Sequence, residues 1–363
     1  MKITCDAKRF VLGCTIAKAM KLKTTLPVTS LVMIEATEGK AYLKATNLKT
    51  YIIFDLQAEV EEEGQCFVNP NFAQRFARAE KGQIGLRTIG KQDVELSNVG
   101  GDGSIKTKLI NIGKFDPVSL PKLNDPPLIK RVLTNIQRPF SYALQCVDVV
   151  DLTRPVLTGV LLDFQKDNLT LVSADGFRLI KVKVAMENEP EQQVIIPATA
   201  IRLIAEYMKG DIAFTSDKIK AWFETDDLTI ITQTIQGTYP QYASLIPDNL
   251  PNWTIECSAP LLAQRLSQMS SEAPGIIRLT QQDNMLRATS RVEDLEETEA
   301  FIPASIVGKG KIAVNRQYLL EGLAIFSEMK IESTAPSNPL KITGDLEGIT
   351  LVIMPMFVQW EED

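Results

Sequence analysis

The sequence predicts an α+β protein made of three copies of one domain, and three observations lead to this prediction. The 363 residues are enough for two to four domains of roughly 100 to 200 residues each. Hydrophobic residues make up 45% of the chain and charged residues 23%, which is typical of a globular protein with an ordinary core. The third observation is an internal repeat, whose period is too long for a solenoid and long enough for an independent core.

Two sequence landmarks define the repeat. A strand-like segment is followed by a short polar segment three times, at Thr46, Ser173 and Thr289, which are 127 and 116 positions apart. A strand enters a helix through a turn residue at Pro70, Pro197 and Asn315, which are 127 and 118 positions apart. The shared period predicts three domains, at 1–124, 125–250 and 251–363, the last with a C-terminal tail.

Each predicted domain has the same order of hairpins and helices. Three β-rich runs interrupted by turn residues predict hairpins at 29–45, 158–174 and 276–290. Apolar residues spaced by three and four predict helices. These helical stretches are 6–23, 69–81, 130–147, 197–210, 258–270 and 315–326. Their apolar faces are expected to form the core.

The composition excludes several kinds of chemistry. The chain has no histidine, which removes the commonest general base and the commonest transition-metal ligand. Its five cysteines contain no CxxC pair, so neither a disulfide framework nor a zinc site is expected. The acidic runs 59–64 and 293–299 lack the spacing of a calcium loop. We therefore expect no catalytic residue, no metal and no cofactor. No membrane span or signal peptide is recognisable, so the cytoplasm is the expected location.

Positive charge is concentrated in the predicted helices. The six stretches carry a net +11 although the whole chain carries −6, so the remainder carries −17. Lysines and arginines on one helix usually form a solvated face. Their recurrence in all three domains instead favours contact with the phosphates of a nucleic acid, without readout of bases.

Five phrases then identify a family. They are SADGFRL (173–179), VIIPATAIRLI (194–204), GTYPQYASLIP (237–247), NRQYLLEGL (315–323) and MPM (354–356). Together they resemble the β subunit of bacterial DNA polymerase III, the sliding clamp, over essentially the whole chain. The resemblance implies the DNA clamp fold, a ring closed by a head-to-tail homodimer, with helices lining the hole and antiparallel sheets outside. It also implies a non-catalytic processivity factor that encircles double-stranded DNA.

The resemblance implies a pocket that receives short linear peptides of DNA polymerase and clamp-loader subunits. Met, Leu and Pro side chains beside glycine would give such a pocket a pliable apolar lining. The matching positions are Arg154, Ala174, Gly176, Phe177, Arg178, Leu179, Pro240, Leu245, Tyr318, Met354, Pro355 and Met356. Taken singly, most of these residues would be read as ordinary core.

The resemblance also implies DNA-facing residues and a contact between subunits. The expected DNA-binding residues are Lys8, Lys18, Lys21, Lys23, Arg75, Arg78, Arg138, Arg202, Lys209, Arg265 and Arg316. The expected dimer contacts are Ile105 and Leu109, in the strand at 104–110, and Met269.

Two departures from the family pattern bear on partner choice. Phe177 stands where many members have histidine, and FVQWEED follows Met356 where an Arg-Leu ending is usual. We expect either that the tail 357–363 lies over or beside the peptide pocket, or that it is disordered. A specialised duplicate or a mobile-element clamp that serves another polymerase stays open as an alternative. A metal-dependent nucleic-acid enzyme using Asp226 and Asp227 is a further alternative.

Overall fold

The structure of the chain is a computed structural model. It describes residues 1–20, 27–80, 82–90, 93–99, 107–110, 130–148, 153–187, 190–269, 275–292 and 296–360. The described residues form two compact units. Unit 1 comprises Met1–Gln137 and Thr199–Ile235, and unit 2 comprises Arg138–Ala198 and Gln236–Asp363.

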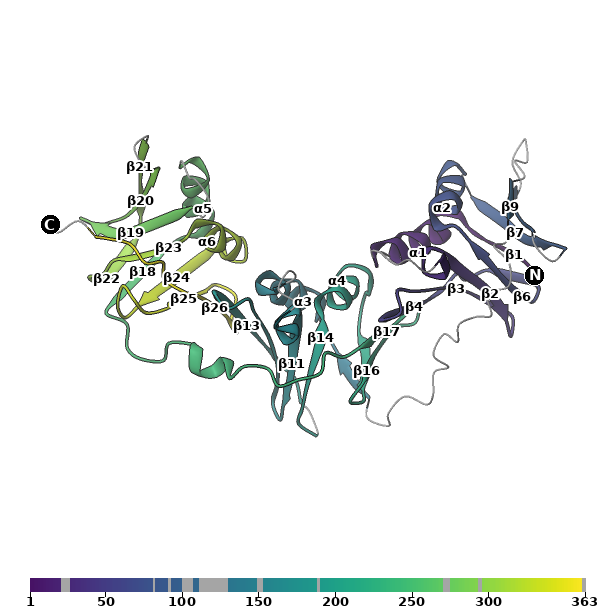
Figure 1. The fold of residues 1–363 in the computed structure, drawn as a ribbon, viewed down its shortest axis with the longest axis horizontal. Coiled ribbons are helices and arrows are strands. Elements are labelled where there is room, and N and C mark those ends of the chain that lie inside the picture. Colours follow the sequence, from purple (N-terminus) through teal and green to yellow (C-terminus); the bar gives the residue numbers. More distant parts are fainter. Residues whose placement is uncertain are drawn as a thin grey trace. The chain divides into compact units, whose positions relative to one another are not determined.

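Unit 1 contains two antiparallel sheets (Figure 1). The smaller sheet has the order β5 (Glu59–Glu62), β1 (Lys2–Asp6), β7 (Gln83–Ile89), β8 (Asp93–Val99), β9 (Thr107–Ile110). The larger has the order β10 (Arg131–Leu133), β15 (Ile212–Ser216), β16 (Lys220–Glu224), β17 (Leu228–Gln233), β4 (Thr50–Asp55), β3 (Lys40–Thr46), β2 (Val32–Thr37), β6 (Gly64–Val68). Its helices include α1 (Ala7–Ala19) and α2 (Pro70–Ala79).

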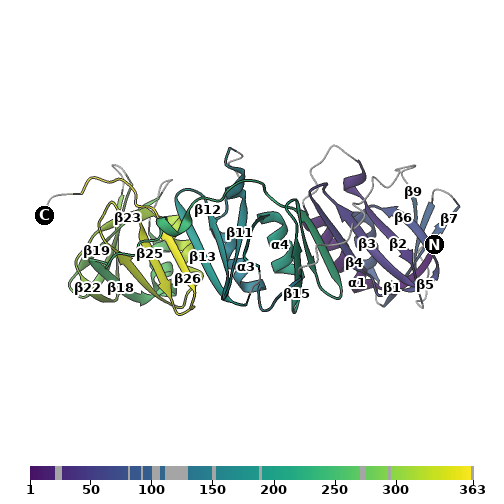
Figure 2. The same ribbon diagram turned by 90° about the horizontal axis from the view of Figure 1, so that it is seen from below.

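Unit 2 also contains two antiparallel sheets (Figure 2). The larger has the order β14 (Gln192–Pro197), β11 (Gly159–Gln165), β12 (Asn168–Ala174), β13 (Arg178–Ala185), β26 (Ile349–Ile353), β25 (Leu340–Gly344), β24 (Glu328–Ser333), β18 (Trp253–Ser258), β22 (Ser305–Gly308). The smaller has the order β21 (Glu296–Pro303), β20 (Met285–Val292), β19 (Ile276–Gln282), β23 (Ile312–Asn315). Its helices include α5 (Ala259–Gln268) and α6 (Arg316–Leu323).

The order of elements along the chain repeats three times. Each run has a strand, a helix, three or more strands, a second helix and three strands, and the first helices are α1, α3 (Gln137–Ala143) and α5. The second helices are α2, α4 (Ala198–Tyr207) and α6. The second run supplies strands to both units, because β17 pairs with β4 in unit 1 and β13 pairs with β26 in unit 2.

Local sequence explains the hairpins and the helix starts. The β2–β3 hairpin turns at Glu38 and Gly39, whose φ angles of 50° and 71° fit a two-residue turn that twists with the strands. Helix α1 begins after Asp6, whose carboxylate accepts a hydrogen bond from the Arg9 N–H at 3.0 Å. Helix α2 begins with Pro70 after Asn69, a favoured arrangement at a helix start.

One predicted helix is wrong in its first half. Residues Arg131–Leu133 form strand β10 and pair with β15, and helix α3 starts at Gln137. Asn135 between them has a φ angle of 54°, which breaks any helix that would continue through it. Pairing with a distant strand therefore overrides the local apolar spacing.

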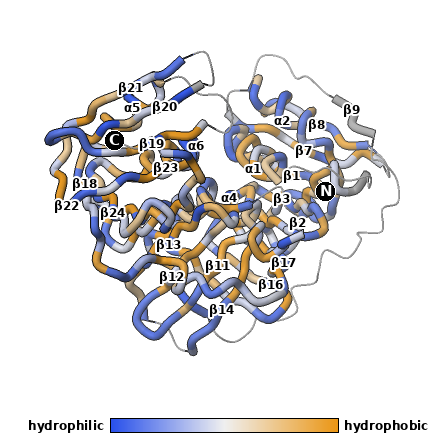
Figure 3. Tube along the Cα trace, turned by 60° about the vertical axis from the view of Figure 1, so that its left-hand side comes forward, coloured by the Kyte–Doolittle hydropathy of each residue, from blue (hydrophilic) through white to orange (hydrophobic). Residues whose placement is uncertain are grey.

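The interiors of both units are apolar, and all five cysteines lie in them. The alternation of hydrophobic and hydrophilic residues along the strands can be followed in Figure 3. Burial raises the pKa of the thiols of Cys5, Cys14, Cys66 and Cys257 to about 12. No helix in the described part of the chain is long and apolar enough to cross a membrane.

The buried thiols give a first prediction. Because the thiolate is the reactive species and burial disfavours it, a thiol-specific reagent at pH 8 will label the folded chain slowly. In denaturant all five cysteines will react at the rate of a free thiol. Counting labelled thiols by mass spectrometry along a denaturant series checks this, and rapid labelling of several cysteines without denaturant would contradict the burial.

Candidate functional site

Unit 2 contains a groove of about 370 Å³ beside the junction of β13 and β26. Three segments contribute to its wall: the turn before β13, the 3₁₀ turn Tyr242–Leu245 with the residues that follow it, and the loop after β24. The lining residues are Ala174, Gly176, Arg178, Leu179, Ser244, Leu245, Ile246, Pro247, Asp248, Asn249, Thr334, Asn338, Pro339, Val352 and Met354.

The turn before β13 requires glycine at its centre. Asp175 accepts hydrogen bonds through Oδ1 from the N–H groups of Phe177 at 2.9 Å and Arg178 at 3.0 Å, which closes the turn. Gly176 has a φ angle of 93°, and a Cβ atom there would lie 2.6 Å from Nη1 of Arg154. The sequence Asp-Gly therefore lets the backbone of the turn approach Arg154 closely.

Arg178 ties the turn to helix α6 beneath the groove. Its Nε lies 3.0 Å from Oδ2 of Asp175, and its Nη1 donates to Glu321. The guanidinium also lies 4.4 Å from the ring centroid of Tyr318, a distance typical of a cation–π contact. The guanidinium of Arg178 is thus held by two carboxylates of the chain itself.

The ion pair of Arg178 with Glu321 predicts a pH dependence of stability. Burial raises the pKa of Glu321, but hydrogen bonds from Gln317 and Arg178 and the charge of Arg178 outweigh it, so the pKa lies below its usual value of 4.5. A carboxyl whose pKa is lowered by folding stabilises the protein above its unfolded pKa and loses that contribution as the pH falls through the folded pKa.

We therefore expect the stability difference between the wild type and Glu321→Gln to be present at pH 6 and to shrink below pH 4.5. Urea unfolding of both proteins between pH 7 and pH 3 measures this difference. A difference that stays constant over the whole range would show that the charge of Glu321 does not contribute.

The rest of the groove is apolar and partly open. Leu179 and Val352, paired across β13 and β26, are each 3% exposed and form its base. Leu245 and Met354 are 51% and 44% exposed and stand at its edges. Half-exposed apolar side chains over a buried base suit an extended peptide that inserts apolar residues.

The predicted pocket residues separate into three groups. Ala174, Gly176, Arg178, Leu179, Leu245 and Met354 line the groove. Arg154, Phe177 and Tyr318 lie just behind or beside it: Arg154 donates to the Asp175 carbonyl at 3.3 Å, and the rings of Phe177 and Tyr318 stack at 6.4 Å. Pro240, Pro355 and Met356 do not line it.

Sequence reasoning missed the loop after β24 and the second half of the 237–247 phrase. Thr334, Asn338 and Pro339 come from the loop, and Ile246 and Pro247 extend the contribution of Leu245. Val352 could have been found, because it lies two residues before Met354 on a strand. The loop carries no signal of its own, since its place depends on the pairing of β24 with β25.

The C-terminal tail leaves the groove at once. The Met354 N–H donates to the Phe177 carbonyl at 2.8 Å, but the Met356 N–H donates to the Ala313 carbonyl of β23 at 2.7 Å. Trp360 then lies against Lys311, whose Nζ is 5.1 Å from the ring centroid. The described part of the tail therefore runs toward the smaller sheet of unit 2, and residues 357–360 do not line the groove.

Most of the predicted DNA-binding residues are exposed on helices or just beyond a helix end. The exposed ones are Lys8, Lys18, Arg75, Arg78, Arg138, Arg202, Lys209 and Arg265. Arg316 differs, because its guanidinium donates to the carbonyls of Leu266 at 2.8 Å and Ser267 at 3.1 Å and so caps the end of α5. Lys21 and Lys23 lie outside the described residues.

The predicted dimer contacts are less well placed. Ile105 lies outside the described residues, and Leu109 belongs to β9, whose backbone alone is described. Met269 is 6% exposed at the end of α5, so its side chain packs in the interior and offers little surface to a second chain.

One of the two carboxylates considered for a metal site has partners within unit 1. Asp227 is paired with Arg9, at 3.2 Å between Oδ1 and Nη2, and its backbone carbonyl accepts from the Asp55 N–H. Among the residues that the structure describes, no group of three or more acidic or cysteine side chains could hold a metal ion. The Asp226–Asp227 pair is explained as a hairpin turn between β16 and β17.

Comparisons with known proteins agree on one family. Residues 143–241 match the family model described as the central domain of the DNA polymerase III beta subunit. A beta sliding clamp of Synechocystis sp. is 26% identical, with 98% of this chain and 99% of that protein covered. One of Staphylococcus aureus is 26% identical, with 93% and 94% covered.

Solved structures show the same fold. The DNA polymerase III subunit beta of Borrelia burgdorferi, in complex with a natural product, superposes with a TM-score of 0.89 at 19% identity and covers 99% of this chain and 100% of its own. That of Pseudomonas aeruginosa gives a TM-score of 0.88 at 18% identity, with 99% and 100% covered.

Proposed function

We propose, since this chain is a relative of the bacterial DNA polymerase III beta subunits, that it is a DNA sliding clamp. In this role it encircles duplex DNA and tethers a DNA polymerase and other DNA-processing proteins to it. The observation that carries the proposal is the way in which the sheets continue from one repeat to the next.

The two junctions between repeats use equivalent strands. The third strand after the first helix of one repeat pairs with the third strand after the second helix of the next repeat, as β4 with β17 and as β13 with β26. By the same rule β21 of the last repeat and β9 of the first are the equivalent strands that remain, and each is the end strand of its sheet among the described residues.

A second copy of the chain can complete this pattern. Pairing β21 of one copy with β9 of another is a head-to-tail contact, which yields a closed ring where the rotation between copies permits closure. The charges favour it: β21 begins Glu-Glu-Thr-Glu, whereas the segment with β9 carries Lys106 and Lys108. We infer a homodimeric ring, with three domains in each copy bounded near residues 124 and 250.

The exposed basic residues on helices would attract the DNA. Contacts with phosphates hold a duplex without reading its sequence. They weaken as the salt concentration rises, because salt cations compete for the phosphates. The whole chain carries −6 although the helical stretches carry +11, so the residues outside these stretches are strongly acidic and repel DNA. Retention on DNA would accordingly be topological, with the basic residues adding a weak attraction that permits sliding.

The groove in unit 2 would receive the partners. Its buried Leu179 and Val352 and its half-exposed Leu245 and Met354 suit short peptides of polymerase and clamp-loader subunits. We assign the chain no reaction of its own, no cofactor and no metal.

Comparing how long the protein stays on circular and on linear DNA tests the proposal. The protein is loaded on nicked circular DNA, by a clamp loader or by mild opening of the dimer, and gel filtration follows it before and after the circle is cut. We expect co-elution with the circle and release after linearisation, together with a native mass of two chains. A monomer that binds circular and linear DNA equally would overturn the ring.

A further inference from the structure

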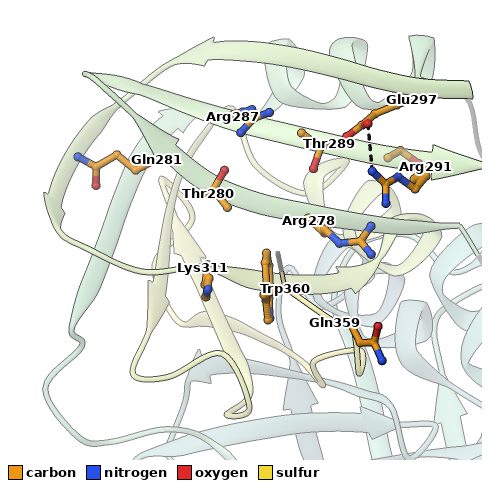
Figure 4. A pocket seen from close by; sticks show the side chains of 11 residues that line it. Arg278, Thr280, Gln281, Arg287, Thr289, Arg291, Glu297, Lys311, Gln359 and Trp360 are labelled. Atoms are coloured by element: carbon orange, nitrogen blue, oxygen red, sulfur yellow. Dashed lines mark hydrogen bonds and ion pairs between the residues drawn. The ribbon is translucent and has the colours of Figure 1, made fainter. Parts of the chain in front are cut away.

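The smaller sheet of unit 2 has one face that is rich in positive charge. Along β19 the buried Ile277 and Leu279 alternate with Arg278 and Thr280, so the arginine and threonine project from the other face. The neighbouring strand β20 follows the same alternation. A pocket of about 210 Å³ lies on this face, lined by Arg278, Thr280, Gln281, Arg287, Thr289, Ser290, Arg291, Glu297, Lys311, Gln359 and Trp360 (Figure 4).

The cations of this pocket are incompletely neutralised. Arg287 pairs with Glu299, and Arg291 lies 3.4 Å from Glu297. Arg278 forms no ion pair with any residue that the structure describes, and the contact recorded for Lys311 is with the ring of Trp360. Arg278 and Lys311 therefore have no carboxylate partner among the described residues, and they add two cations to a pocket that otherwise holds the Arg287 and Arg291 ion pairs.

Polar atoms without partners also lie at the pocket. The hydroxyl oxygen of Thr280 and the amide oxygen of Gln281 are buried atoms that have no hydrogen-bond partner within the described structure. A buried hydroxyl without a partner is costly, so a ligand that accepts its hydrogen bond is favoured. The unpaired guanidinium of Arg278 and this hydroxyl come from the same strand face and would suit a carboxylate.

The tail forms the opposite wall of the pocket. Figure 4 shows Gln359 and Trp360 across from the arginines of β19 and β20. The Met356 N–H bond to Ala313 and the contact of Trp360 with Lys311 hold the described tail against β23. Trp360 is the last residue that the structure describes, and Glu361, Glu362 and Asp363 follow it in the sequence.

We propose that this pocket is a binding site for an acidic peptide segment that follows an aromatic residue, and that residues 361–363 of the same chain occupy it. Three residues span about 10 Å, so carboxylates directly after Trp360 can reach the pocket that Trp360 lines. Attachment to the same chain gives them an effective concentration in the millimolar range, far above that of a free competitor. The site is separate from the peptide groove and does not depend on DNA.

Trp360 reports on the docked tail in the full-length chain. The other two tryptophans, Trp222 and Trp253, are 5% and 1% exposed, so a water-soluble quencher lowers mainly the fluorescence of Trp360. We expect acrylamide to quench Trp360 weakly at low salt and more strongly as salt rises. Replacing Glu361, Glu362 and Asp363 by their amides should shift the balance between docked and free tail by roughly tenfold and abolish the salt dependence.

Charge variants identify the site. Arg278→Glu should expose Trp360 as the neutral tail does, and adding Glu361→Lys with Glu362→Lys to it should restore the protection. Glu347→Gln and Arg265→Gln, which change exposed charges outside the pocket, are the matched controls and should leave quenching unchanged. Circular dichroism establishes that each variant is folded.

Two results would overturn the proposal. One is quenching of the wild type at low salt that equals that of the neutral-tail variant. The other is protection of Trp360 by a thymidine oligonucleotide with no effect of neutralising the tail, which would assign the pocket to nucleic acid instead. Neither measurement involves a circular DNA or the dimer, so the inference and the proposed clamp function can fail separately.

Discussion

Truncating Leu245 and Met354 to alanine together should weaken the binding of an apolar linear peptide by about 2 kcal/mol or more, roughly 30-fold in Kd. Both side chains stand at the edges of the groove and are 51% and 44% exposed, so a bound peptide would bury them further. Because they are half-exposed in the free protein, their truncation should change the free energy of unfolding little. Fluorescence anisotropy with short synthetic peptides that contain two or three apolar residues measures the effect.

Phe357 and Leu250 supply matched controls for this experiment. They are 101% and 92% exposed and do not line the groove, so their alanine variants should bind the same peptides as the wild type. Equal losses for the controls and the groove variants would show that the peptides bind through general surface hydrophobicity, and the groove would then lose its assigned role.

Gly322→Ala should destabilise unit 2 by about 2 to 3 kcal/mol, although alanine favours a helix by about 1 kcal/mol over glycine. Gly322 is buried in α6 where the helix crosses β26, and a Cβ atom there would lie 2.1 Å from Cδ2 of Leu351. Leu351 is 1% exposed, so it can turn away from the new methyl group only by displacing neighbours in a close-packed interior. Urea unfolding monitored by circular dichroism measures the loss.

A double-mutant cycle with Leu351→Ala separates this clash from any other effect. The single change Leu351→Ala leaves a cavity and should itself cost about 2 to 5 kcal/mol. If the new methyl group conflicts with Leu351, the double variant should cost clearly less than the two single changes together. Additive costs would place the strain of Gly322→Ala elsewhere.

Local patterns in the sequence predicted most elements but not the sites where distant segments meet. The predicted hairpins at 29–45, 158–174 and 276–290 correspond to β2–β3, β11–β12 and β19–β20, because alternation and turn residues are local signals. Strand β10 was read as helix, because its only reason to be a strand is its pairing with β15. Local spacing contains no information about such a partner.

The groove shows the same limit. Ala174 to Leu179 were found from one contiguous phrase, whereas Pro339 and Val352 enter the groove only through the pairing of β24, β25 and β26. Arg316 was expected to bind DNA, yet its guanidinium donates to a carbonyl at the adjacent end of α5. Trp360 was expected near the groove, but the hydrogen bond from Met356 to β23 directs the tail to the other sheet.

The joining of β4 to β17 also determines when the chain can fold during its synthesis. The hydroxyls of Thr50 and Thr232 lie 3.0 Å apart across this junction, although 182 positions separate them. At about 5 to 20 residues per second, a ribosome needs roughly ten seconds or more to supply the second strand. Until then β4 is an open edge that invites pairing with other nascent chains. The first repeat therefore cannot complete its larger sheet until the second repeat has been synthesised, and β4 stays exposed during that time.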